Sequence, residues 1–385
     1  MTDTPAVYGA EPLPPATTEE LMEALCAPEM GPRTLRALLR HFGSWSAVRK
    51  ATAEEFRDLG ASAAAHRAIR KGTAAAAAKA EIRKTETAGV TLLKYGDPGF
   101  PPALLLHEDL PLLLYTKGGL LEQDALAIAI VGSRRASLYG AMHAERFAFE
   151  LAQAGFTVVS GLALGIDAAA HRGALKGRGR TLAVLGNGLP AIYPPENEEL
   201  AGQVAANGAV ISELPIGTAP APGNFPVRNR IIAALALGVL VVEANRKSGA
   251  LITARLAGEM GKEVLAVPGD IGRPQSRGPH QLIRDGATLV ESVQDILDQL
   301  GPVTGNMKVA ETGESIPDMR AMQLNPIERK VYDLLDSVPK DIDTLTRESG
   351  LSPGNAASVL LVLELRKMAV QMPGKLYVRP GTLQR

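Results

Sequence analysis

Short runs of consecutive apolar residues alternate with helix-like spacings of apolar positions through the middle of the chain. The runs cover residues 126–132, 157–161, 181–186, 209–213, 238–244 and 262–267. Between them, apolar residues recur with the helical period, which is typical of helices that pack on a sheet. Strands and helices that alternate in this way join through right-handed crossovers. The pattern therefore predicts an α/β fold with a doubly wound, mainly parallel sheet, whose ligands bind at the carboxyl ends of the strands.

A helical pattern precedes this region. Residues Thr17 to Glu20, and again Thr52 to Glu55, have the spacing of a capping box, and an alanine-rich run over 62–88 favours a helix. We predict a small all-α N-terminal domain over 17–88, after a disordered, proline-rich tail over 1–16. Short helices broken by glycine resemble a helix-hairpin-helix or sterile-alpha-motif unit, which touches DNA backbones. A plain helical docking domain is the alternative.

The end of the chain predicts a C-terminal winged helix over 324–385. A polar linker at 302–323 separates it from the sheet domain, which we place at 89–301. Helical patterns then cover 326–335, 342–349 and 352–368, and two short apolar runs around Gly374 fit a hairpin wing. A winged helix that reads duplex DNA lays its third helix in the major groove.

The third helix of this predicted winged helix is poor in positive charge. Its early turns, from Asn355 to Val359, are neutral, and neither Arg nor Lys occurs before Arg366. We therefore predict that this domain contacts a partner or serves regulation, and does not grip duplex DNA strongly.

The overall charge excludes a protein that wraps duplex DNA through a general positive field. The 41 Lys and Arg residues balance the 41 Asp and Glu residues, so any nucleic-acid binding must come from local clusters. Cys26 is the only cysteine, which excludes an internal disulfide framework and a cysteine-based metal site. Without an apolar signal core or a membrane-length apolar run, the chain is expected to be soluble and cytoplasmic.

Two pairs of arginines are predicted to lie at the starts of helices, where the helix dipole disfavours a cation. Arg228 and Arg230 follow Pro226, which suits a first helical position, and Arg134 and Arg135 follow the first strand of the sheet. Such placement makes sense if an anion lies between them, because helix starts already favour phosphate. The alternative is that the arginines lie on a solvated surface and pair with acidic neighbours.

The loops after the strands are rich in glycine but match no nucleotide-binding fingerprint. Neither G-x-G-x-x-G nor the Walker pattern occurs, so we expect no dinucleotide or ATP cofactor. The loop from Ser160 to Asp167 carries Gly161 and Gly165, which let backbone N–H groups approach an anion. Several shallow anion sites along one sheet edge suit a ligand with spaced phosphates, such as a nucleic-acid strand.

Catalytic constellations are few. Asp167 and His171 are four residues apart on one predicted helix face, but nothing nearby completes a metal or hydrolytic site. We expect Asp167 to order the glycine loop and His171 to pack or to bond a backbone carbonyl. Glu213 and Glu243, at strand ends, are expected to hold the arginines of residues 225–230. A basic cluster over 171–180 is expected to be a solvated helix end, with an extension of the phosphate track as the alternative.

A series of motifs resembles the DNA-processing protein A (DprA/Smf) family. The motifs are Ile130-Val131-Gly132-Ser133-Arg134, the stretch from Ser160 to His171, Ile192-Tyr193-Pro194, Phe225-Pro226-Val227-Arg228-Asn229-Arg230, Ser248-Gly249-Ala250 and Gly286-Ala287. Their order and spacing match over about 90–300. The resemblance implies an extended Rossmann-like fold that binds single-stranded DNA without base specificity and loads the RecA recombinase during natural transformation. It also implies a protein that is not an enzyme, with single-stranded DNA-binding protein as a further partner.

The resemblance also implies which residues bind DNA. Carried over by position, they are Gly132, Ser133, Arg134, Gly161, Gly165, Phe225, Arg228, Asn229, Arg230, Ser248 and Gly249. Phe225 is expected either to stack on a base or to act as a hydrophobic staple of its helix. No metal ligands and no catalytic residues are implied.

The family's dimer region corresponds to the segment that holds His280, Leu282, Ile283 and Leu289. The same surface is implied in RecA contact, so the two contacts could compete. Two departures stand out: Gly186-Asn187-Gly188 where Gly-Cys-Gly is frequent, and Gly278-Pro279-His280 where Gly-Thr-Asn is frequent. The second affects the detail of the dimer edge.

A nucleotide-cleaving enzyme of the related lysine-decarboxylase-like phosphoribohydrolase group is the alternative function. That group depends on a P-G-G-x-G-T-x-x-E stretch, and Ser248-Gly249-Ala250 lacks its glycine pair and its glutamate. Release of free base from nucleoside monophosphates would separate the two hypotheses.

Overall fold

A computed structural model describes residues 12–301, 326–335, 340–365, 368–372 and 376–378. The chain forms two compact units, Met1–Ala310 and Glu311–Arg385. The expected linker at 302–323, most of the expected tail at 1–16, and Arg366 lie outside the described residues. No helix in the described ranges has both the length and the apolar character needed to cross a membrane.

The first unit begins with the predicted helices. They are α1 (Thr18–Leu25), α2 (Pro32–Phe42), α3 (Trp45–Val48), α4 (Ala53–Asp58), α5 (Ala63–Arg70) and α6 (Thr73–Thr87). Both capping boxes are present, since the side chains of Thr17 and Glu20, and of Thr52 and Glu55, bond each other's backbone N–H groups. Trp45 is buried among these helices, and its indole N–H donates to the buried carboxylate of Glu23 at 2.9 Å.

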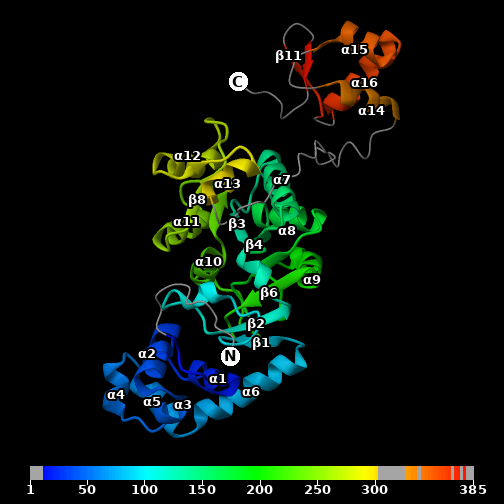
Figure 1. The fold of residues 1–385 in the computed structure, drawn as a ribbon. Helices are drawn as coiled ribbons and strands as arrows, with labels where there is room; N and C mark the ends of the chain where they lie inside the picture. The colour runs from blue at the N-terminus through cyan, green and yellow to red at the C-terminus, as the bar shows by residue number, and fades with distance from the viewer. Residues whose placement is uncertain (1–11, 302–325, 336–339, 366–367, 373–375, 379–385) are drawn as a thin grey trace. The chain divides into compact units, whose positions relative to one another are not determined.

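A nine-stranded sheet follows, in the order β1-β2-β6-β5-β4-β3-β7-β8-β9 (Figure 1). Its strands are β1 (Thr91–Lys94), β2 (Leu113–Gly118), β3 (Ala127–Val131), β4 (Thr157–Ser160), β5 (Thr181–Val184), β6 (Gly208–Ser212), β7 (Gly238–Val241), β8 (Glu263–Ala266) and β9 (Thr288–Leu289). The pairs from β6 through β9 are parallel, whereas β1 and β2 add an antiparallel edge. The predicted doubly wound, mainly parallel sheet is confirmed.

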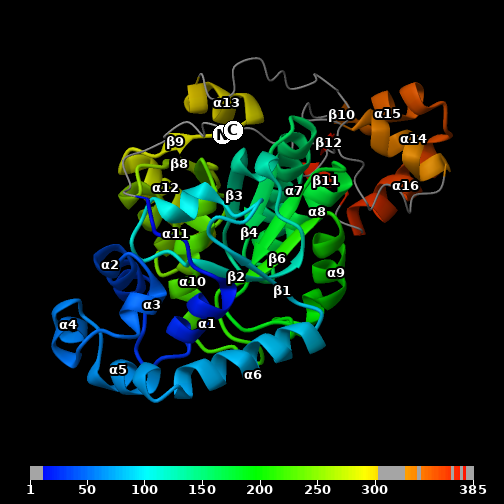
Figure 2. The same cartoon turned by 60° about the horizontal axis from the view of Figure 1, so that its bottom comes forward.

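Helices cover both faces of this sheet (Figures 1 and 2). They are α7 (Leu138–Gln153), α8 (Ile166–Lys176), α9 (Glu198–Ala206), α10 (Asn224–Leu235), α11 (Gly249–Glu259), α12 (Arg277–Arg284) and α13 (Val293–Leu300), with short 3-10 turns at Pro102–Leu105, Glu122–Ala125, Pro195–Asn197 and Pro274–Ser276. Along β3, Ala127 and Ala129 pack with α10 and α11, while Ile128 and Ile130 pack with α7 and α8. This alternation is the period of two expected for a strand between two helical layers.

The N-terminal helices share a core with the sheet domain. Leu35, Leu38 and Trp45 belong to the same buried cluster as Leu104 and the α10 residue Ile231. Buried Arg36 of α2 donates to the carbonyls of Leu104 and Leu110, at 2.8 and 2.9 Å. The two predicted domains therefore pack as one compact unit, although the chain passes from helix to strand between Thr87 and Thr91, near the expected boundary.

The second unit has the secondary structure of a winged helix. It contains α14 (Pro326–Leu334), β10 (Lys340–Asp341), α15 (Ile342–Ser349), α16 (Pro353–Leu365), β11 (Val370–Met372) and β12 (Leu376–Val378), with strand order β10-β12-β11. Its helices enclose a separate core around Val331, Leu345, Leu360 and Leu363. The predicted arrangement of three helices and a hairpin is confirmed.

Candidate nucleic-acid interface

The sheet has one topological switch point, and it lies at β3. From β3 the chain moves outward through β4, β5 and β6, and then returns to place β7 on the other side of β3. The loops after β3 and β7 therefore leave the sheet edge in different directions, which opens a crevice at the carboxyl ends of the strands. A cavity of about 630 Å³ occupies this place.

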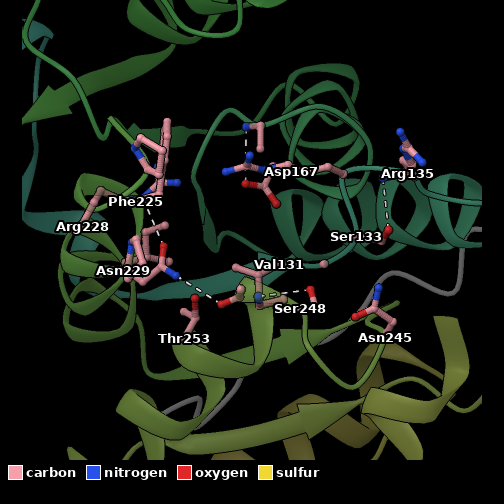
Figure 3. A pocket seen from close by; sticks show the side chains of 18 of the residues that line it. Val131, Ser133, Arg135, Asp167, Phe225, Arg228, Asn229, Asn245, Ser248 and Thr253 are labelled. Atoms are coloured by element: carbon pink, nitrogen blue, oxygen red, sulfur yellow. Dashed lines mark hydrogen bonds between the residues drawn. The ribbon is translucent and has the colours of Figure 1, made fainter. Parts of the chain in front are cut away.

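The cavity brings most of the expected site residues together (Figure 3). Its lining includes Gly132, Ser133, Arg134, Phe225, Arg228, Asn229, Ser248 and Gly249, together with Val131, Arg135, Ala163, Asp167, Tyr193, Pro220, Pro222, Pro226, Ile232, Asn245, Ala250 and Thr253. Gly161, Gly165 and Arg230 are not part of the lining. Gly161 packs against Arg228, Gly165 packs against the Ser133 carbonyl, and Arg230 pairs with Glu213. In Figure 3, Phe225, Arg228 and Asn229 of α10 face the loop that carries Ser133 and Arg135.

Aromatic and cationic groups meet at the mouth of this cavity. The Phe225 ring lies 5.7 Å from the ring of Tyr193, centroid to centroid, and the Arg134 guanidinium lies over it at 5.0 Å. Tyr193 is 41% exposed and Arg134 is also exposed. Phe225 is the second residue of α10, inside the helix, whereas a hydrophobic staple precedes the N-cap. The staple hypothesis for Phe225 is therefore wrong.

Arg228 is buried, contrary to the hypothesis of a solvated surface arginine. Its side chain is 5% exposed, and one guanidinium nitrogen donates to the carbonyls of Gly161, at 2.9 Å, and Val184. Burial lowers the pKa of Arg228 to about 10, while the negative charge of Asp167 opposes this shift. The arginine stays protonated at neutral pH and ties α10 to the ends of β4 and β5.

The neighbours of Arg228 are fixed by internal partners as well. Arg230 forms a partly buried ion pair with Glu213, at 2.5 Å between nitrogen and oxygen, as expected for Glu213. The amide of Asn229 donates to the carbonyl of Gly249 at 3.2 Å, which joins α10 to the start of α11. α10 begins at Asn224, so Pro226 is its third residue and not its first as predicted, and Arg228 falls in the second turn.

The loop glycines allow close packing between loops. A Cβ atom on Gly161 would lie 2.5 Å from the Arg228 guanidinium, and one on Gly165 would lie 2.3 Å from the Ser133 carbonyl oxygen. Gly165 also has a φ of +79°, which L side chains rarely adopt. These contacts explain why glycine is needed at both positions, and they seat the β3 and β4 loops against each other.

The N-terminus of α7 is occupied by a carboxylate from the protein's own chain. Glu243, at the end of β7, accepts hydrogen bonds from the backbone N–H and the hydroxyl of Ser137, the N-cap of α7, at 2.8 and 2.5 Å. Glu243 therefore serves the α7 terminus and does not hold the arginines of residues 225–230, so that expectation is wrong. Arg134 and Arg135 line the cavity.

Asp167 orders the glycine loop, as expected. Its carboxylate accepts from the Ala163 N–H at 3.4 Å, and burial raises its pKa while Arg228 lowers it. His171 is fully buried, and its Nδ1 lies 2.7 Å from the Thr181 hydroxyl. That hydroxyl donates to the Val158 carbonyl, so the imidazole N–H donates to a side chain and not to a backbone carbonyl. Burial lowers the pKa of His171 to about 3.

The basic cluster after His171 lies toward the amino ends of the strands, opposite the end that carries the cavity. α8 starts at the carboxyl end of β4 and ends at Lys176, and the following residues, which include Arg178 and Arg180, lead to the amino end of β5. Lys176 pairs with Glu145, and Arg180 with buried Asp124. The interpretation as a helix end fits this placement better than an extension of the phosphate track does.

Sequence reasoning missed several lining residues. Tyr193 belongs to a quoted motif and follows β5, so its position after a strand was the available signal. Pro220 and Pro222 belong to a proline-rich loop, and Asn245 and Thr253 lie beside Ser248, but their types alone carry no signal for a ligand.

The residues expected at the dimer interface lie at the end of the sheet opposite to β1. Leu289 is in the edge strand β9 and is 44% exposed. Leu282 and Ile283 of α12 are half-buried, and Leu282 packs against the main core. His280 Nε2 lies 2.9 Å from the Gly269 carbonyl oxygen, which gives it an internal partner.

The doubly wound sheet is open and has arginine and aromatic side chains around a cavity at its switch point, and the chain also has a winged helix. Together these features define a Rossmann-like protein that acts on nucleic acid. Residues 91–301 match the family profile of DNA recombination-mediator protein A, and residues 315–375 match that of the DprA winged helix domain. The chain belongs to the DNA-processing protein A (DprA/Smf) family, as its motifs predict. The profile of this family is that of a DNA recombination mediator, and its members include DNA processing proteins.

Individual relatives support the assignment. Protein Smf of Escherichia coli is 42% identical over 282 residues, which are 73% of this chain and 75% of that protein. DNA processing protein DprA of Streptococcus pneumoniae is 46% identical over 201 residues, 52% of this chain and 71% of that protein. The X-ray structure of the Streptococcus pneumoniae protein matches with a TM-score of 0.65 and 34% identity, over 74% of this chain and 98% of that one.

Proposed function

We propose that this chain binds single-stranded DNA, without base specificity, in the cavity at the switch point. The observation that carries the proposal is the side-by-side placement of exposed Arg134 with Phe225 and Tyr193. An arginine attracts a phosphate, and an aromatic ring offers its face to any base. In a duplex the base faces are stacked on one another, so such a platform favours an unpaired strand.

The residues divide into two roles under this proposal. Arg134, Arg135, Phe225 and Tyr193 contact the strand, together with the polar groups of Ser133, Ser248 and Asn229. Arg228 supplies positive charge from a buried position and holds the loops together. Gly161, Gly165 and Arg230 support this arrangement without lining the cavity. Gly132 and Gly249 let the backbone of the β3 and β7 loops lie close to the ligand.

The chain is proposed to act as a non-enzymatic binder in the cytoplasm, without a cofactor. The carboxylate in the lining, Asp167, is engaged with the Ala163 N–H and with the charge of Arg228, so it suits loop ordering better than glycosidic bond cleavage. If incubation with nucleoside monophosphates releases free base, the phosphoribohydrolase alternative holds instead.

We place partner contacts at the β9 edge. A sheet edge with an exposed Leu289 next to half-buried Leu282 and Ile283 of α12 suits pairing with a second copy of the chain. The same surface is proposed to receive RecA, which would be loaded on the bound strand, with single-stranded DNA-binding protein as a further partner. His280 shapes this edge through the Gly269 carbonyl.

Binding of labelled single-stranded and duplex oligonucleotides across a salt series tests the DNA proposal. We expect tighter binding of the single strand, and we expect Arg134→Ala to reduce the salt slope by about 1 because one phosphate contact is lost. Arg172→Ala removes an exposed arginine of α8 outside the cavity lining and should behave as wild type. Equal affinity for both DNA forms, or an Arg134→Ala protein indistinguishable from Arg172→Ala, would contradict the proposal.

A further inference from the structure

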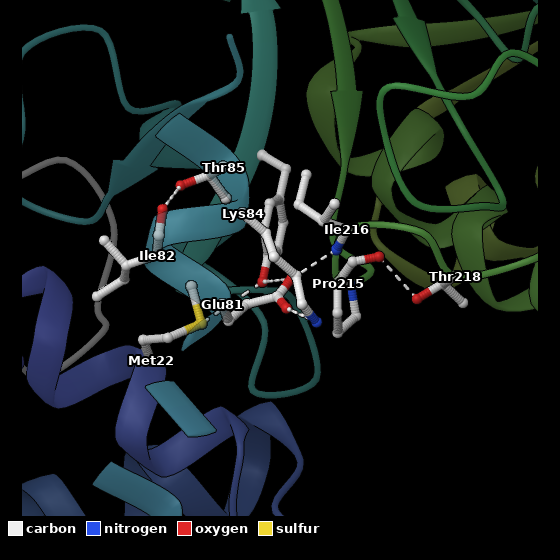
Figure 4. A network of polar contacts seen from close by, with 9 residues as sticks. Met22, Glu81, Ile82, Lys84, Thr85, Pro215, Ile216 and Thr218 are labelled. Carbon is white, nitrogen blue, oxygen red and sulfur yellow. Dashed lines mark hydrogen bonds and ion pairs between the residues drawn. The ribbon is translucent and has the colours of Figure 1, made fainter. Parts of the chain in front are cut away.

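A buried carboxylate of the N-terminal helices contacts the segment that forms one wall of the cavity. Glu81 lies on α6 and is 6% exposed. Its Oε1 accepts a hydrogen bond from the backbone N–H of Ile216, at 2.6 Å, and a longer one from the Tyr115 hydroxyl, at 3.4 Å. Figure 4 shows the Glu81 side chain reaching from α6 toward Pro215 and Ile216.

Ile216 belongs to residues 213–223, which connect β6 to α10 and are called the wall segment below. The far part of the wall segment lines the cavity through Pro220 and Pro222 and leads directly to Phe225. Residues 219–223 are all exposed, so burial of apolar surface does not hold this part in place. Its position depends on the attachments at its base.

Besides the ion pair of Glu213 with Arg230 of α10, the base has attachments on two further sides. On the sheet side, the Gly217 N–H donates to the Leu189 carbonyl at 3.2 Å, and the Thr218 carbonyl accepts from the Gly188 N–H at 2.9 Å. On the other side, Glu81 holds the Ile216 N–H. The wall segment is thus clamped between the loop after β5 and the N-terminal helices.

The Ile216 contact is the shortest hydrogen bond that Glu81 makes. A carboxylate that accepts from a backbone N–H forms a short, charge-assisted hydrogen bond. The ion pair with Lys84 is longer, at 3.1 Å, and the Lys84 side chain is 59% exposed, so water screens it. The Tyr115 bond is longer still. Loss of the Glu81 acceptor therefore acts chiefly on the wall segment.

We propose that Glu81 is a positioning residue for single-stranded DNA binding, through which the N-terminal helices set the shape of the cavity wall. The inference rests on the proposed function for the identity of the ligand. It gives the N-terminal helices a part in DNA binding that does not require them to touch DNA. It also predicts that a partner which moves α6 would change the affinity of a cavity built by the sheet loops.

Three substitutions at Glu81 separate its hydrogen bond from its volume and charge. Glu81→Gln keeps an acceptor oxygen, Glu81→Met keeps the length without a comparable acceptor, and Glu81→Ala removes both. Glu86→Ala, at an exposed position of the same helix, is the matched control. Two quantities are measured on the full chain: hydrogen exchange of the wall segment, which needs no ligand, and affinity for labelled oligo(dT).

We expect Glu81→Met and Glu81→Ala to exchange faster in the wall segment and to bind oligo(dT) about three- to tenfold more weakly, with Glu81→Gln and Glu86→Ala close to wild type. If Glu81→Ala does not fold, Glu81→Met against Glu81→Gln decides. Exchange in the wall segment that is unchanged in Glu81→Met, or raised equally throughout the protein, overturns the inference. If the wild type binds no oligo(dT), the proposed function fails, and the exchange measurement still decides whether Glu81 holds the wall segment.

Discussion

Two arginines that look equivalent in the sequence differ in what surrounds the guanidinium. Arg134 is exposed over an aromatic ring, where it can leave its contact and meet a phosphate. Arg228 is enclosed by two backbone carbonyls and faces the charge of Asp167. A substitution at Arg134 should therefore change DNA binding alone, and one at Arg228 should change stability as well.

Arg228→Ala should lower the free energy of unfolding by about 2–4 kcal/mol, because it leaves buried carbonyl oxygens without a donor. Single-stranded DNA affinity should fall as well, since α10 and the β4 loop lose their tie. Arg228→Lys keeps the charge and one donor nitrogen but loses the Nε–H that donates to Asn229 Oδ1 at 3.2 Å, so its stability should be intermediate. Urea unfolding and oligonucleotide binding check this, with exposed Arg255→Ala as control. An Arg228→Ala protein as stable as wild type would contradict the assigned contacts.

His171 makes stability depend on pH. Burial lowers its pKa from 6.5 to about 3 in the folded protein, so between these values the unfolded chain binds the extra proton. Stability should therefore fall as pH drops below 6.5, with a contribution of up to about 1.4 kcal/mol per pH unit from this group. His171→Asn can still donate to Thr181 but does not titrate, so its unfolding free energy should fall less steeply. Parallel curves for the two proteins would exclude this role.

At the scale of elements, the cavity depends on how closely two loops and one helix approach one another. The β3 loop, the β4 loop and α10 meet where Gly161, Gly165 and Arg228 touch. Because these glycines leave no room for a Cβ atom, the loops behave as one packed layer at the end of the sheet. Motion of one loop is expected to displace the others.

Gly165→Ala should be strongly destabilising for this reason. A Cβ atom would lie 2.3 Å from the Ser133 carbonyl oxygen and 2.8 Å from that of Arg134, at a φ of +79°. We expect a loss of about 2–4 kcal/mol and weaker DNA binding through displacement of the Arg134 loop. Gly202→Ala, in the open interior of α9, should instead stabilise by about 0.5–1 kcal/mol. Thermal unfolding compares the two, and equal effects would contradict the packing argument.

The order of strands and helices could be predicted because the strands of the parallel sheet are short and mostly apolar, as in residues 127–131 and 238–241. Eight of the twenty lining residues could be predicted, from motifs at the strand ends and at the starts of α10 and α11. The partner of Glu243 could not, since Ser137 is far from it in sequence and a glutamate at a strand end fits either a helix start or an arginine. The burial of Arg228 could not be predicted either, because it depends on the carbonyls of Gly161 and Val184, which are far from Arg228 in the sequence.

At the scale of the whole molecule, single-stranded DNA binding is proposed for the first unit, and the second unit has a different surface. The exposed positions of α16 include Gly354, Ala357, Ser358 and Leu361, which are small or apolar, and none of these carries a charge. Phosphate contacts dominate the affinity of DNA-binding helices. The winged helix is therefore suited to a protein partner.

The isolated second unit should bind duplex DNA more weakly than micromolar at physiological salt. It has its own core around Leu345 and Leu360, so it can be measured apart from the first unit. Ser358→Arg, on the exposed face of α16, adds the missing charge and should raise duplex affinity with a steeper salt slope, which shows that the assay detects such binding. Removal of the second unit should leave the single-strand affinity of the first within about twofold, because the proposed contacts all lie at the sheet edge. Submicromolar duplex binding by the wild-type unit would mean that α16 reads DNA without basic residues in its early turns, and the assignment to a protein partner would then be wrong.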